Sequence, residues 1–70
     1  MFEFFKKDIK KKLEKKLGNS AHVSLIPVSL SVDRRVAKSF RRYVYQVTFE
    51  KSNLIVYFSV RGKFISSILY

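Results

Sequence analysis

The segment DRRVAKSFRR, residues 33–42, carries five basic side chains and one acidic side chain. Arginine suits nucleic-acid recognition because its planar guanidinium group can bind two phosphate oxygens or a guanine edge, and can stack on a base. The aromatic ring within the segment could stack on an unpaired base. These residue types predict contacts to DNA or RNA from Arg34, Arg35, Lys38, Phe40, Arg41 and Arg42.

A second basic group occupies the segment 2–17, which contains seven lysines and three acids. Several of these lysines stand four residues apart, which makes them neighbours on a helix at a cost of about 0.2–0.5 kcal/mol per pair. An ordinary solvated helix face is the alternative interpretation, but a bound polyanion would relieve the repulsion. We expect Lys7, Lys11 and Lys15 to contact phosphates, on a surface that adjoins the arginine-rich segment.

The overall charge favours the same class of partner. Fifteen lysines and arginines oppose five acids, which gives a net charge of +10 on 70 residues. Such a charge favours binding to nucleic acid or to an anionic membrane. Two alternatives follow: association with a membrane surface through the N-terminal segment, where Phe4 would face away from the apolar stripe, and binding of an acidic protein. Small size and lysine richness are also typical of accessory proteins of viruses and plasmids.

Catalytic and metal-binding chemistry finds little support in the residue types. The chain has no cysteine, one histidine (His22) and two glycines, which leaves too few zinc ligands and no glycine-rich phosphate loop. We expect no enzymatic activity, no cofactor, no metal and no small-molecule substrate. The catalytic alternative is metal-free RNA cleavage, in which basic groups stabilise phosphate charge while Tyr or Glu transfers a proton. Its candidates are Arg42, Tyr43, Glu50, Arg61 and Tyr70.

The periodicity of the chain predicts an N-terminal helix that would carry the lysines. Apolar residues recur at spacings of three and four over residues 2–17, and at roughly 100° per residue they fall within an arc of about 120°. Gly18 and Asn19 then end the helix. The apolar stripe consists of Phe2, Phe5, Ile9, Leu13 and Leu17.

From Ala21 onward, alternation of apolar and polar residues predicts strands. In the first strand the phase reverses around Ile26 and Pro27, so we expect a bend or bulge there and an edge position. The alternation then resumes at Val28, Leu30 and Val32. Residues 33–39 would connect this strand to the second, giving a β-ribbon with a cationic tip. The other strands are expected at 39–50, 54–60 and 63–70, with turns at 51–53 and 61–62.

The predicted fold is α+β, with an N-terminal amphipathic helix packed on one face of a four-stranded antiparallel meander sheet, in a single domain of residues 1–70. On the second strand, the more apolar face is assigned to the helix side; it consists of Tyr43, Tyr45, Val47 and Phe49. The last two strands are apolar on both faces, and one helix covers one face. We therefore expect a homodimer that buries part of the second face or edge.

No stretch of the sequence is apolar enough for a secretory signal or a membrane span, which needs roughly 20 residues. A cytoplasmic location is the resulting expectation.

Overall fold

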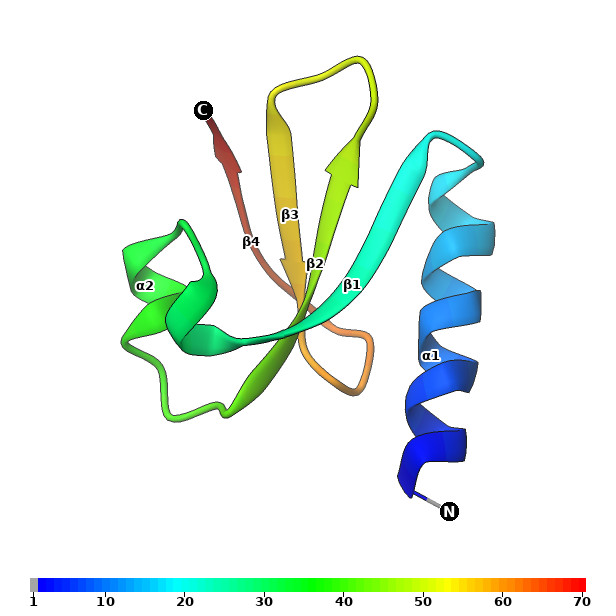
Figure 1. Ribbon diagram of the computed structural model, residues 1–70, viewed down its shortest axis with the longest axis horizontal. Coiled ribbons are helices and arrows are strands. Elements are labelled where there is room, and N and C mark those ends of the chain that lie inside the picture. The colour runs from blue at the N-terminus through cyan, green and yellow to red at the C-terminus, as the bar shows by residue number, and fades with distance from the viewer. Residues whose placement is uncertain (1) are drawn as a thin grey trace.

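The computed structural model describes the backbone of residues 2–70 and the side chains of residues 9–70. The predictions made for the side chains of Phe2, Phe4, Phe5 and Lys7 lie outside the described residues. The elements are α1 (Phe2–Leu17), β1 (Ala21–Pro27), the 3-10 turn η1 (Val28–Leu30), α2 (Arg34–Ala37), β2 (Tyr43–Phe49), β3 (Leu54–Phe58) and β4 (Phe64–Leu69). The strands form one antiparallel sheet in the order β1-β2-β3-β4, which confirms the predicted α+β meander (Figure 1).

The strand pairing determines which segments meet at each end of the sheet. Pro27 pairs with Tyr43, while Phe58 pairs with both Tyr45 and Phe64. β1 and β3 therefore finish, and β2 and β4 begin, at one common end. We call it the lower end, after its place in Figure 1, and the opposite end the upper end.

The face of the sheet on which α1 packs holds the first hydrophobic core. Leu13 of α1 is buried there against Val23, Tyr45 and Val47, with Phe49 partly buried beside them. Ile9 and Leu17 also pack against this cluster, which confirms the described part of the helix stripe. The assignment of Tyr45, Val47 and Phe49 to the helix side is likewise confirmed.

Tyr43 departs from this pattern because it is 46% exposed. It begins β2 and pairs with Pro27 in the last pair of the β1-β2 ladder, at the rim of the sheet. Its predicted place in the core is therefore wrong.

The second face of the sheet is covered by the chain that connects β1 to β2 (Figure 1). Val36 of α2 is 1% exposed and belongs to a second core with Val44, Ile55 and Tyr57. The predicted ribbon with a cationic tip is therefore wrong, because the connection folds back over the sheet as η1 and α2. This coverage removes the apolar face from which a homodimer was inferred, although the homodimer itself stays a prediction.

The first strand is shorter than predicted because it ends at Pro27. Proline fixes φ and has no N–H to donate, so it terminates a ladder readily. The N–H of Val28 donates to the carbonyl oxygen of Arg42 at 3.0 Å, and the chain then turns through η1. Leu30 and Val32, predicted within the strand, are 68% and 56% exposed. The expected bend near Pro27 and the edge position of β1 are both confirmed.

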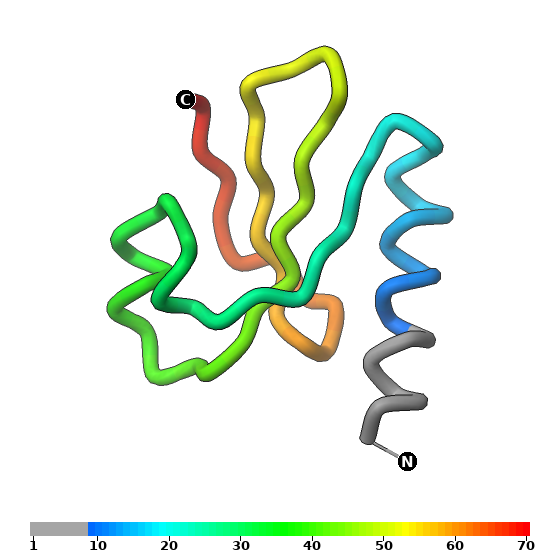
Figure 2. Tube along the Cα trace, in the orientation of Figure 1, coloured from blue at the N-terminus to red at the C-terminus, as the bar shows by residue number. Residues whose placement is uncertain are grey.

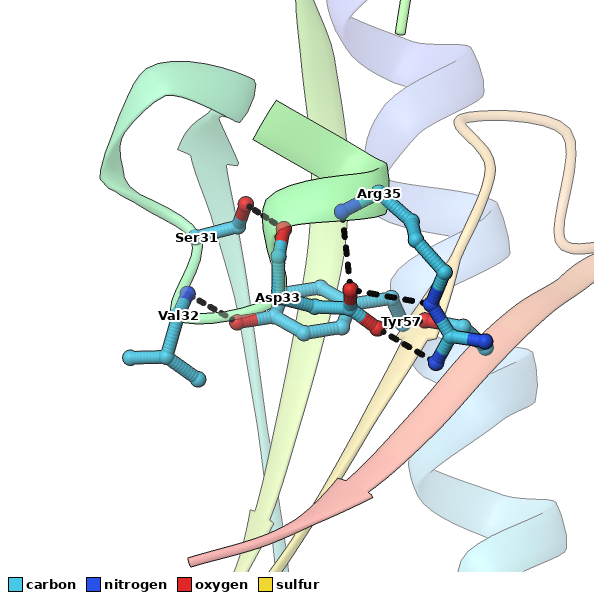
Figure 3. Close-up of polar contacts among 6 residues, drawn as sticks. Ser31, Val32, Asp33, Arg35 and Tyr57 are labelled. Carbon is cyan, nitrogen blue, oxygen red and sulfur yellow. Dashed lines mark hydrogen bonds and ion pairs between the residues drawn. The ribbon is translucent and has the colours of Figure 1, made fainter. Parts of the chain in front are cut away.

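A buried carboxylate, that of Asp33, fastens the connection to the sheet, and Figure 3 shows its bonds to Arg35 within the connection. Asp33 is 3% exposed and caps α2 by accepting a hydrogen bond from the N–H of Arg35 at 2.9 Å. It also accepts bonds from the Arg35 guanidinium at 3.0 and 3.2 Å and from the hydroxyl of Ser66, in β4, at 2.8 Å. The hydrogen bonds from Arg35 and then Ser66 lower the pKa of Asp33 from 3.8 to about 2. Asp33 thus ties α2 to the far edge strand.

Tyr57 makes a second polar tie between the connection and the sheet. Its hydroxyl accepts a hydrogen bond from the N–H of Val32 at 2.9 Å and donates one to Oε1 of Gln46 at 2.8 Å. The ring is fully buried, and this burial raises the pKa of Tyr57. Removing the hydroxyl would deprive the N–H of Val32 of its acceptor and Oε1 of Gln46 of its donor.

Candidate nucleic-acid interface

The arginine-rich segment is anchored on both sides by buried valines. Val36 and Val44 are 1% and 0% exposed in the second core, and the carbonyl oxygen of Arg42 accepts the hydrogen bond from Val28. Every predicted contact residue in this segment is exposed, two of them in α2 beside Val36 and four between the two valines. They are Arg34, Arg35, Lys38, Phe40, Arg41 and Arg42. The structure therefore exposes all six on one segment that buried residues hold at Val36 and at Val44.

Arg35 has a structural partner that its neighbours lack. Its guanidinium forms an ion pair with the buried Asp33 at 3.0 Å, although the arginine side chain is 75% exposed. Among the described residues, the other carboxylate ion pair joins Lys10 to Glu14 within α1. Within the described part of the chain, four cations of the segment thus remain unneutralised by a carboxylate. These are Arg34, Lys38, Arg41 and Arg42.

Phe40 is the most exposed large apolar residue of the described chain, at 107% of its reference surface. It stands in a tight bend where the N–H of Arg41 donates to the Ser39 hydroxyl at 3.3 Å. A ring in this position contributes nothing to the core, while aromatic rings that stack on bases need this exposure. Its predicted exposure is confirmed.

The described lysines of α1 do not adjoin the arginine-rich segment. Lys11 and Lys15 are exposed, and Lys7 lies outside the described side chains. Figure 1, viewed down the shortest axis, shows α1 beside β1 on one side of the molecule and α2 on the other. The prediction of adjoining zones is wrong because α1 packs on the first face while the β1-β2 connection covers the second.

Cations that were not predicted to contact nucleic acid lie at the lower end of the sheet, between these two groups (Figure 1). The β3-β4 turn, residues 59–63, and the segment 39–42 both leave the sheet at this end (Figures 1 and 2). The turn carries exposed Arg61 and Lys63, and its Gly62 lies against Ile9 of α1. The basic residues on either side of Gly62 are visible in the sequence as a cationic turn. Their position beside α1 could not be predicted, because that contact joins distant parts of the chain.

The residues proposed for RNA cleavage do not converge. Arg42, Tyr43 and Arg61 lie at the lower end, while Glu50 follows β2 at the upper end and Tyr70 hydrogen-bonds to the β2-β3 turn there. β2 alone separates the two ends by roughly 20 Å, at about 3.3 Å per residue. The described residues also contain no cluster of three or more His, Cys, Asp or Glu able to hold a metal ion.

Neither helix, over the residues described, has the length and apolar character needed to cross a membrane. The chain has no significant match among protein-family models, curated proteins or solved structures, so no relative indicates a function.

Proposed function

We propose that the protein binds DNA or RNA through the phosphate backbone, with the segment 34–42 as the principal contact surface. The observation that carries this proposal is the exposure of four cations that no described carboxylate neutralises, on a segment anchored by Val36 and Val44. An anchored segment has little conformational entropy left to lose on binding, so more of the interaction energy remains as affinity.

The exposed ring of Phe40 supports a contribution from unpaired bases. Stacking of a base on an aromatic side chain contributes about 1–3 kcal/mol and tolerates any sequence. Phosphate contacts carry no sequence information either. The expected ligand is therefore single-stranded or partly unpaired nucleic acid, bound with little sequence preference.

The packing of α1 favours nucleic acid over a membrane surface as the polyanion. An interfacial helix must turn its apolar face toward the lipid. In the described part of α1, that face is formed by Ile9, Leu13 and Leu17, and all three pack against the sheet. Lipid binding would have to detach the helix from the first core.

The proposal is tested by fluorescence anisotropy with labelled single-stranded DNA, single-stranded RNA and duplex DNA of equal length. Arg42→Gln should weaken binding about three- to tenfold at low salt, because one charge-assisted phosphate contact is lost. Lys51→Gln is the matched control, since Lys51 is exposed in the β2-β3 turn at the upper end. It removes the same charge and should leave the affinity nearly unchanged.

Equal losses from the two substitutions would contradict a localised interface. Two further measurements separate the alternative partners. Co-sedimentation with anionic vesicles would support association with a membrane surface. Capture of an acidic protein after nuclease treatment would support the acidic-protein alternative.

A further inference from the structure

A hollow between α1 and the β3-β4 turn collects three positive side chains from distant parts of the sequence. Its volume is about 180 Å³. A water molecule occupies about 30 Å³ in the liquid, so a phosphate group and part of its hydration shell would fit. The lining residues are Ile9, Lys12, Leu13, Lys16, Arg61 and Gly62, and none of them is acidic.

The turn on one side of the hollow is held firmly. The hydroxyl of Ser59 accepts hydrogen bonds from the N–H groups of Arg61 and Lys63, at 3.3 and 3.1 Å. Two backbone bonds of 2.8 Å close the same turn. Gly62 has φ +88°, and a Cβ atom there would lie 3.4 Å from Cγ2 of Ile9. The positive φ therefore favours glycine, while a Cβ atom at that distance would make ordinary van der Waals contact with Ile9. The turn lies against α1 and places Arg61 beside the helix.

The helix side of the hollow is equally fixed by burial. Lys12 and Lys16 stand one helical turn apart, and such pairs lie on the same helix face. Leu13, which lines the hollow with them, is 5% exposed and belongs to the first core. The two ammonium groups are thus attached to a part of α1 that cannot shift without disturbing the sheet.

The charges around the hollow are unbalanced among the described residues. A neighbouring hollow on α1 contains Lys11 and Lys15 but also Glu14, which pairs with Lys10. The hollow beside Arg61 has no such acid in its lining. The side chain of Asp8, four residues before Lys12 in the sequence, lies outside the described residues. Three converging cations raise the local potential, and a bound anion lowers it.

We propose that this hollow is a phosphate-binding site. The planar guanidinium of Arg61 can bind two phosphate oxygens, and Lys12 and Lys16 add positive charge from the opposite wall. On nucleic acid it would hold one backbone phosphate, a part of the proposal that rests on the function proposed above.

The site is tested by titrating the full chain with sodium phosphate and, at matched ionic strength, with sodium chloride, while amide shifts are followed by NMR. The amides of Gly62, Lys63 and Leu13 should shift saturably with phosphate, with half-saturation on the order of 10 mM. Arg61→Gln should raise the half-saturation concentration about two- to fivefold. Lys51→Gln should leave it unchanged. Unsaturable shifts identical to those with chloride, or no effect of Arg61→Gln, would overturn the site.

A second arm with a single-stranded oligonucleotide separates this site from the general function. Support would be a shift of the Gly62 amide on binding, and weaker binding by Arg61→Gln. An oligonucleotide that binds wild type and Arg61→Gln equally would overturn the site while the function stands. A saturable phosphate response without oligonucleotide binding would support the site and overturn the function. Sedimentation with phosphatidylglycerol vesicles that Arg61→Gln abolishes would overturn nucleic acid as the source of the phosphate.

Discussion

Truncation of Val36 to alanine tests whether α2 is the structural support of the arginine-rich segment. Val36 is 1% exposed and is the buried residue of α2. The substitution removes two buried carbon atoms, which corresponds to about 1.6 kcal/mol of transfer free energy at roughly 0.8 kcal/mol each. The cavity left behind adds about 1 kcal/mol, so the free energy of unfolding should fall by about 2–3 kcal/mol. A 70-residue domain has about 3.5–10 kcal/mol in total, so the loss amounts to between roughly a fifth and four fifths of the free energy of unfolding.

The assay is urea denaturation followed by circular dichroism, with Val32→Ala as the control. Val32 is the same residue type in the same connection but is 56% exposed, and surface substitutions usually change stability by less than about 0.5 kcal/mol. Val36→Ala should also lower Tm by roughly 10–20 °C. If the two variants had the same stability, the second face would not be covered as described, and the account of how the arginines are anchored would be refuted.

Three further predictions concern titration, stacking and assembly. Stability should decline as the pH falls from about 4 toward 2, because Asp33, with its pKa lowered from 3.8 to about 2, stabilises the fold only while ionised. The stabilisation by ionised Asp33 is complete above pH 4 and is lost as the pH passes through 2. In Asp33→Asn the urea midpoint should therefore lack this decline at low pH, and a variant profile identical to that of the wild type would contradict the prediction. Phe40→Ala should leave Tm unchanged and weaken single-stranded DNA binding by about 1–3 kcal/mol, with little effect on duplex; equal losses on both ligands would rule out stacking. If the protein is a homodimer, light scattering should give twice 8.3 kDa. Leu69→Lys on the uncharged edge strand β4, where Leu69 is 75% exposed, should then restore the monomer mass; a wild-type mass of one chain would show the dimer prediction to be wrong.

Local periodicity was sufficient to predict most of the scaffold. The apolar stripe that includes Leu13 marks the helix, and Gly18, with φ +95°, follows its last residue. Alternation in β2 assigns Tyr45 and Val47 to the helix side correctly. These features depend on neighbours in the sequence, which is why the sequence alone reveals them.

The cover of the second face could not be read from the same pattern. Val28, Leu30 and Val32 alternate with polar residues as they would in a strand. In the structure the chain departs from the sheet after Pro27, and Leu30 and Val32 are therefore exposed. α2 has four residues, too few to show a helical period, and its signal is the capping residue Asp33. The partner that explains the burial of Asp33 is Ser66, 33 residues away in the sequence.

One candidate surface could likewise be predicted from the local sequence, and the other depends on tertiary packing. Exposure of the segment 34–42 could be predicted because its charges cannot be buried unpaired. The approach of Arg61 to Lys12 and Lys16 depends on how α1 packs across the sheet. No spacing in the sequence encodes that packing, so the hollow becomes visible only in the fold.

The salt dependence of nucleic-acid affinity measures how many phosphates the segment 34–42 contacts. If the four unneutralised cations of the segment 34–42 each contact a phosphate, the log-log slope should be about −3.6 on duplex DNA, four times −0.9, and about −2.8 on single strands. The double variant Arg41→Gln, Arg42→Gln should make the duplex slope about 1.8 less steep. A slope near zero for the wild type, or one that the double variant leaves unchanged, would contradict phosphate binding by this segment.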